Sequence, residues 1–194
     1  MTTATSPTPT AVVFDLGKVL LEFDYGIVAR RLAAHSGRDA EQIRGLLDQS
    51  PLLFRLESGQ MTNEEFFDEV SSLTGYTGGF GEFANIFGDI FSAIHPMIDL
   101  HGQLRARGVP TFIFSNTNEL AVRHIRANYA FFAHFTDYIY SHEAGAMKSC
   151  DFLFLFYVLF NIGTLSEEEK KTQPRPWRSR TRTTQKKTER KKYY

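Results

Sequence analysis

The sequence predicts an α/β fold with a parallel sheet and a largely helical insertion. An apolar run at 11–14 lacks the alternation of a half-exposed strand, which favours a buried strand of a parallel sheet. A second strand pattern at 109–114 leads through a polar turn into a helical pattern. Between them, residues 25–100 have apolar side chains at helical spacing. A chain of 194 residues is long enough for one compact domain with a smaller insertion.

The first strand is expected over Ala11–Phe14, directly before Asp15. In open α/β sheets the ligand crevice lies at the carboxyl ends of the strands, so a carboxylate at this position can act on a substrate. Gly17 lets the backbone turn sharply and approach a ligand closely. The alternative is that Asp15 only opens a turn, and this segment alone leaves both interpretations open.

Residues 25–100 are expected to form several helices. The first begins near Tyr25 and would be closed by Gly37, and the second begins near Asp39 and stops before Pro51. A third follows the capping-box pattern of Thr62 and Glu65.

The rest of this segment contains a glycine-rich loop and an aromatic stripe. The loop, 75–81, lacks the lysine of a phosphate-binding P-loop, so we interpret it as a connection. The stripe over 83–94 predicts a further helix, ended by Pro96. Such a stripe packs in a core far more often than it forms a cofactor site.

The second strand is followed by Ser115 and Asn116, and the next helix begins at Glu119. The free N–H groups of that helix start, with the Ser115 hydroxyl and the Asn116 amide, would form a cradle for an oxyanion or a phosphate. The alternative is ordinary capping of the helix by a polar side chain, which is the commoner arrangement for such a turn taken alone.

A third, short strand at 138–140 leads to Lys148, the only lysine between Lys18 and Lys170. Its place just past a strand end suggests a function, and a solvated loop lysine is the alternative. The six histidines match no ligand spacing, so we assign no metal to them.

Three segments together carry a resemblance to a known family: FDLGKVLLEFD from Phe14, FSNTNELAVRH from Phe114 and SHEAGAMKSCDFLF from Ser141. In this order, with a helical segment between the first two, they resemble the haloacid dehalogenase superfamily of hydrolases. Within it they resemble the small sugar-phosphate phosphatases of the alpha-D-glucose-1-phosphate phosphatase type. The resemblance covers roughly residues 11–165.

The resemblance implies a Rossmann-like three-layer core over 11–24 and 101–165, with an α-helical cap over 25–100 inserted after the first strand. It also implies a Mg²⁺-dependent phosphatase that acts on a small phosphorylated metabolite, such as a sugar phosphate, through an aspartyl-phosphate.

The same resemblance assigns roles to individual residues. Asp15 would be the nucleophile, Ser115 and Asn116 would bind the phosphoryl oxygens, and Lys148 would bind substrate and neutralise charge during catalysis. Mg²⁺ would be bound by the Asp15 carboxylate and the Gly17 backbone carbonyl.

Two positions depart from the family pattern. Most phosphatases of the superfamily have a second aspartate, the general acid, where this chain has Gly17; the sugar-phosphate subgroup shares this gap, and the acid remains unnamed. After Lys170 the chain has no apolar strand and no aspartate, so the final acidic metal ligand is not found. This break suggests a truncation or a shifted reading frame in the C-terminal part of the core. It predicts low stability or association, because 11–14 would form an exposed edge.

Two alternative functions remain open from the sequence. The chain could be a catalytically impaired relative that lacks the last metal-binding motif, or a carbon–halogen hydrolase with the same Asp15 nucleophile. The cap residues indicate only helices and aromatic packing, so the sequence does not identify the substrate.

The net charge of zero conceals an uneven distribution. Residues 1–165 contain 11 Lys+Arg and 18 Asp+Glu, whereas 166–194 contain 11 and 4. The basic tail is expected to be solvated and disordered, and nucleic-acid binding through 170–194 is the lesser alternative. Residues 1–10 are expected to be a disordered leader. A single cysteine suits a cytoplasmic location, and no apolar run is long enough to span a membrane.

Overall fold

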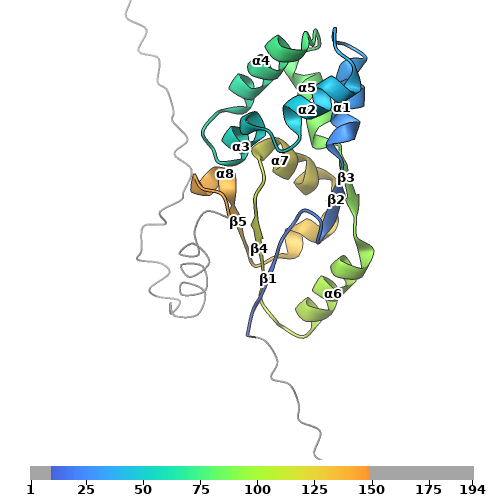
Figure 1. The fold of residues 1–194 in the computed structure, drawn as a ribbon. Coiled ribbons are helices and arrows are strands. Elements are labelled where there is room, and N and C mark those ends of the chain that lie inside the picture. Colours follow the sequence, from blue (N-terminus) through green and yellow to red (C-terminus); the bar gives the residue numbers. More distant parts are fainter. Residues whose placement is uncertain (1–9, 149–194) are drawn as a thin grey trace, which may run out of the picture. The chain divides into compact units, whose positions relative to one another are not determined.

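The computed structural model describes residues 10–148, which contain a parallel sheet, a short ribbon and several helices (Figure 1). The strands are β1 (Val12–Phe14), β2 (Leu21–Phe23), β3 (Phe91–Ala93), β4 (Thr111–Ser115) and β5 (Asp137–Tyr140). The helices are α1 (Tyr25–Ala33), α2 (Ala40–Leu47), α3 (Pro51–Glu57), α4 (Asn63–Thr74), α5 (Phe80–Gly88), α6 (His95–Ala106), α7 (Glu119–Asn128) and α8 (Ser141–Ala144), with a 3₁₀ turn at Ala130–His134.

The parallel sheet has the strand order β1-β4-β5, which confirms the predicted fold class. Phe14 pairs with Ile113, and Ser115 pairs with Tyr140, so the three strands end at the same edge of the sheet. Every residue of β4 is buried, as expected for the central strand of this sheet. Within residues 10–148, β1 pairs only with β4 and is therefore at the edge of the described sheet.

A two-stranded antiparallel ribbon joins the sheet region to the helices α1–α5. Strand β2 follows the turn after β1, and Phe23 of β2 pairs with Phe91 of β3. The prediction of one helix over 83–94 was therefore wrong: α5 ends at Gly88, and Pro96 lies in the first turn of α6. Backbone pairing with β2 makes residues 91–93 a strand, although the apolar residues in this segment continue the spacing of the preceding helix.

Local signals explain where the helices begin. Asp39 and Thr62 are N-caps with complete capping boxes, which confirms both predicted starts. Helix α3, with Pro51 in its first turn, was not predicted separately. Gly37 does not close α1, which ends at Ala33 with a right-handed C-cap. Left-handed C-cap glycines instead end α4, at Gly75, and α8, at Gly145.

Two apolar clusters hold the described residues together. The first is formed by α1–α5, and its centre is aromatic: Phe66 lies 5.1 Å from Phe87 and 5.9 Å from Phe83 between ring centroids. This confirms the prediction that the aromatic stripe is core packing. The second cluster packs around the sheet and includes Phe14, Ile113 and residues of α7.

Helix α6 contacts β4, so the predicted cap boundary at residue 100 falls inside a helix that packs on the sheet. The division into core and cap otherwise stays a prediction. The leader up to residue 9, the helix expected from Asp151, and the tail lie outside the described residues.

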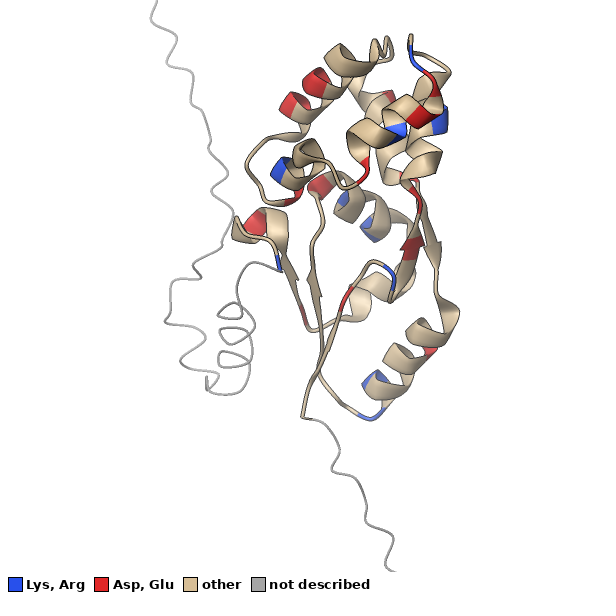
Figure 2. Ribbon diagram, in the orientation of Figure 1, with Lys and Arg blue, Asp and Glu red and all other residues tan. Residues whose placement is uncertain are grey.

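Residues 10–148 contain 11 Lys+Arg and 17 Asp+Glu. Figure 2 shows that α4 has acidic residues and no basic ones, whereas α7 has both acidic and basic residues.

Within residues 10–148, none of the helices has the length and hydropathy needed to cross a membrane.

The N-cap of α7 gives a stability prediction. Asn118 is buried, and its side chain accepts a hydrogen bond from the Ala121 N–H at 3.0 Å. We expect Asn118→Ala to lower the free energy of unfolding by about 2 kcal/mol, because it leaves a buried donor unpaired. The exposed cap Thr62 is the matched control, and Thr62→Ala should cost about 1 kcal/mol. Urea titration measures both, and equal costs would contradict the role of burial.

Candidate functional site

Asp15 lies one residue past the end of β1, with its side chain about one third exposed. One carboxylate oxygen, Oδ1, accepts a hydrogen bond from the Leu16 N–H at 2.8 Å. The other, Oδ2, accepts one from the Lys148 ammonium at 2.5 Å. The side chain is therefore oriented by two donors and still reachable by a ligand.

Lys148 comes to Asp15 from the opposite end of the described chain. Its backbone N–H donates to Asn116 Oδ1 at 2.6 Å, and its ammonium lies 5.8 Å from the centre of the Phe114 ring. The side chain of Asn116 thus links the turn after β4 to the segment after β5. Since the side-chain amide nitrogen of Asn116 has no partner among residues 10–148, it can donate to a ligand.

The turn after β4 is fixed by side chains of α8. The Ser141 hydroxyl accepts from the Thr117 N–H at 3.0 Å and donates to the Thr117 carbonyl at 3.2 Å. His142 Nδ1 lies 2.9 Å from the same carbonyl, so Nδ1 carries the hydrogen. Burial lowers the pKa of His142, which favours this neutral ring.

Ser115 is buried at the end of β4, and its hydroxyl donates to the Asn116 carbonyl at 3.3 Å. The predicted cradle is therefore only partly open, because the Thr117 N–H is already used by Ser141. Lys148 contacts both Asp15 and Asn116, and Ser115 precedes Asn116 at the strand end.

The Phe23 ring packs closely over Gly17. A Cβ atom at Gly17 would lie 2.8 Å from Cε1 of this ring, so a side chain here would force the ring to shift. The Lys18 ammonium lies 4.8 Å from the centre of that ring and pairs with Glu22 at 2.6 Å. Lys18 is thus held at the surface by its own neighbours, and Glu22 is paired with it.

The oxygen donors near Asp15 are suited to Mg²⁺ but few. Mg²⁺ is commonly bound by one or two carboxylates with substrate phosphates and several waters. The Asp15 carboxylate and the Gly17 carbonyl are donors of this kind, and the Gly17 carbonyl accepts no hydrogen bond from residues 10–148. Over that range, no cluster of three or more His, Cys, Asp or Glu side chains could hold a metal ion.

Sequence reasoning did not find the Ser141 and His142 contacts to Thr117. The only signal was the position of both residues directly after the predicted strand 138–140, at the strand end that the other site residues share.

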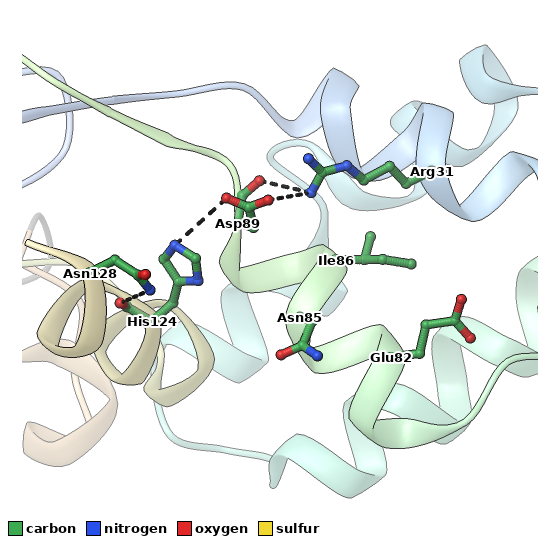
Figure 3. A pocket seen from close by; sticks show the side chains of 7 residues that line it. All are labelled: Arg31, Glu82, Asn85, Ile86, Asp89, His124 and Asn128. Carbon is green, nitrogen blue, oxygen red and sulfur yellow. Dashed lines mark hydrogen bonds and ion pairs between the residues drawn. The ribbon is translucent and has the colours of Figure 1, made fainter.

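An open groove lined by none of these residues lies between α1, α5 and α7 (Figure 3). It has a volume of about 830 Å³, and its polar side chains largely satisfy one another. Arg31 contacts the backbone carbonyl and the carboxylate of Asp89 at 3.0 and 3.1 Å, and His124 lies 3.8 Å from the same carboxylate. We assign no chemistry to this groove.

Comparison with solved structures identifies the fold. A haloacid dehalogenase (HAD) family enzyme from Bacteroides thetaiotaomicron, in complex with magnesium and inorganic phosphate, matches with a TM-score of 0.66 and 19% identity, over 82% of this chain and 81% of that chain. A predicted HAD-like family hydrolase from Porphyromonas gingivalis matches with a TM-score of 0.63 and 24% identity, over 82% and 78%.

The L-2-haloacid dehalogenase from Xanthobacter autotrophicus, with chloropropionic acid covalently bound, matches with a TM-score of 0.53 and 18% identity, over 84% of this chain and 68% of that chain. No protein-family model and no curated protein matches the sequence. The parallel sheet, the ribbon and the inserted helices therefore make up the fold of the HAD enzymes, as the three sequence motifs imply.

Proposed function

We propose that this chain is a HAD-type phosphatase, which hydrolyses a small phosphorylated metabolite through an aspartyl-phosphate on Asp15. The observation that carries the proposal is the contact of 2.5 Å between the Lys148 ammonium and the Asp15 carboxylate at the carboxyl end of the sheet. A phosphate group approaching a carboxylate meets a like charge, and an adjacent ammonium offsets that repulsion.

Each residue of the site has a place in this reaction. Asp15 Oδ1 or Oδ2 attacks phosphorus, and the ester oxygen leaves as the alcohol. Lys148 and the Asn116 amide donate hydrogen bonds to the phosphoryl oxygens. The Ser115 hydroxyl, which now donates to the Asn116 carbonyl, can donate to them as well once it rotates away from that carbonyl. Water then hydrolyses the aspartyl-phosphate and restores Asp15.

Mg²⁺ is part of the proposal, with the Asp15 carboxylate and the Gly17 carbonyl as its protein ligands. When bound, it would neutralise charge on the phosphoryl group. The HAD family enzyme with magnesium and phosphate supports this, since its fold is shared. We also propose a sugar phosphate as the substrate because of the sequence motifs. We propose a cytoplasmic location because the chain has a single cysteine, Cys150.

The test is product release by the full chain, with p-nitrophenyl phosphate and 2-chloropropionate as substrates, in Mg²⁺ and in EDTA. We expect Mg²⁺-dependent phosphate release that Asp15→Asn lowers by about 10³-fold or more, because the amide is a poor nucleophile. Asp99→Asn, at an exposed aspartate of α6, is the matched control and should leave the rate unchanged.

The other outcomes decide between the alternatives. Chloride release without phosphate release would favour a carbon–halogen hydrolase, whose fold is also shared. No turnover from a folded preparation would favour an impaired relative, in line with the small number of metal donors in residues 10–148.

A further inference from the structure

The Ser141 hydroxyl continues the pairing of β4 and β5 at the point where the two strands separate. The last residues that pair in register are Ser115 and Tyr140. Beyond them the two segments turn into α7 and α8 (Figure 1). Ser141 is the first residue of α8, and its hydroxyl accepts from the Thr117 N–H at 3.0 Å and donates to the Thr117 carbonyl at 3.2 Å. One side chain thus replaces the backbone hydrogen bonds that a further step of the sheet would make.

These two hydrogen bonds hold both peptide groups that flank the Thr117 Cα atom. The N–H belongs to the peptide group shared with Asn116, and the carbonyl belongs to the one shared with Asn118. Within residues 10–148, the Thr117 N–H is bonded only to Ser141, whereas the carbonyl is also contacted by His142. Ser141 and Thr117 are buried, at 2% and 6% exposed, so loss of the hydroxyl would leave a buried N–H group without a partner.

The backbone of Asn116 is therefore fixed from both sides. Ser115 before it is paired with β5, and Thr117 after it is held by Ser141. The side-chain torsions of Asn116 are set by the Lys148 N–H, which donates to Oδ1 at 2.6 Å. Because Oδ1 and the amide nitrogen belong to one planar group, the same contact also places the amide donor.

Ser141 is also bonded to the segment that leads to Lys148. Its backbone carbonyl accepts hydrogen bonds from the N–H groups of Gly145 and Ala146, at 2.9 and 3.3 Å. Lys148 follows two residues after Ala146, and its ammonium donates to Asp15 at 2.5 Å. Ser141 thus joins the turn after β4, through its side chain, to the start of the lysine segment, through its backbone.

We propose that Ser141 is a positioning residue for phosphoryl transfer, and this inference rests on the proposed function. Its hydroxyl is used by Thr117 and takes no part in making or breaking bonds. It acts through Thr117 on Asn116. The amide of Asn116 binds the phosphoryl group, and its Oδ1 keeps Lys148 beside Asp15. A shift of about 1 Å in such a group can lower a rate by about 10²-fold, so the reaction depends on a rigid turn.

The first test removes the hydroxyl. We expect Ser141→Ala to lower kcat/KM for p-nitrophenyl phosphate by about 10²-fold, measured on the full chain with Mg²⁺. Thr74→Val is the matched control, because Thr74 is also 2% exposed and its hydroxyl also makes two backbone hydrogen bonds, to the Val70 carbonyl and from the Tyr76 N–H. This variant should lose comparable stability in a urea titration, while its rate changes by less than about twofold.

A double-mutant cycle separates positioning from a structural role. Asn116→Ala should lower kcat/KM by about 10²-fold, since it removes a donor to the phosphoryl oxygens. Because Ser141 acts through Asn116, adding Ser141→Ala to this variant should lower the rate by less than about threefold more. A merely structural Ser141 would cause the same loss in both backgrounds.

A second variant, Ser141→Cys, carries the test if Ser141→Ala does not fold. The thiol fills the space of the hydroxyl but is a weak donor and a weak acceptor. This variant should therefore fold and still lose activity by about tenfold. The loss should again disappear in the Asn116→Ala background.

The outcomes distinguish this inference from the proposed function. The role of Ser141 is overturned by an unchanged rate in Ser141→Ala, by an equal loss in Thr74→Val, or by an additive loss in the double variant. In each of these cases, phosphate release that depends on Asp15 would keep the phosphatase intact. If phosphate release does not depend on Asp15, the proposed function fails, and the role of Ser141 fails with it.

Discussion

Replacement of Lys148 by methionine is expected to lower kcat/KM for a phosphomonoester by about 10³-fold while the protein stays folded. Methionine keeps much of the length of the side chain but removes the ammonium that donates to Asp15 Oδ2 at 2.5 Å. The carboxylate then faces a phosphate dianion without the charge of this ammonium. The backbone N–H of residue 148 still donates to Asn116 Oδ1, so the segment after α8 should keep its place.

Lys18→Met is the matched control for this prediction. The Lys18 side chain is 57% exposed and pairs with Glu22, so its loss should change the rate by less than about twofold. Phosphate release measures activity, and the urea midpoint reports whether each variant is folded. A Lys148→Met enzyme with an unchanged rate would remove Lys148 from the catalytic residues and reduce the proposal to a structural ion pair.

Gly59→Ala is expected to cause a large loss of stability, because the added methyl group would overlap a backbone atom. Gly59 has a φ of +68°, and the added Cβ atom would lie 2.3 Å from the backbone carbonyl oxygen of His142. The left-handed conformation costs an alanine about 1 kcal/mol, and the overlap with a backbone atom adds about 2 kcal/mol. The free energy of unfolding should therefore fall by about 3 kcal/mol in a urea titration.

Gly108 separates the two causes, because it has nearly the same φ, +72°, with open space around its missing side chain. Gly108→Ala should cost only the conformational part, about 1 kcal/mol. Equal losses in the two variants would mean that α3 moves away from α8 at no cost.

The site could be predicted largely because its residues follow three strands that are recognisable one by one. Asp15, Ser115 and Lys148 each come after an apolar strand pattern, and parallel strands bring such positions to one edge. Their contacts are now observed, whereas their roles stay predictions. The contact of Ser141 with Thr117 could not be found in this way, since the two residues are distant in sequence.

The prediction of one long helix over 83–94 failed for a related reason. Phe91 has the spacing of the preceding helical stripe, but its backbone pairs with Phe23, a residue distant in sequence. The spacing of apolar residues along the chain gives no information about such a distant pairing partner. Likewise, Gly37 is compatible with the end of a helix, but α1 ends at Ala33, well before it.

The ribbon of β2 and β3 has a consequence for how such a protein can change over generations. The chain leaves the sheet region at Phe23 and returns at Phe91, directly opposite. Because the two ends of the insertion are already joined by backbone hydrogen bonds, lengthening it adds only a slowly growing entropic cost and leaves the pairing of β1 with β4 unchanged. The helices between these points can thus change in length without breaking the strand order β1-β4-β5.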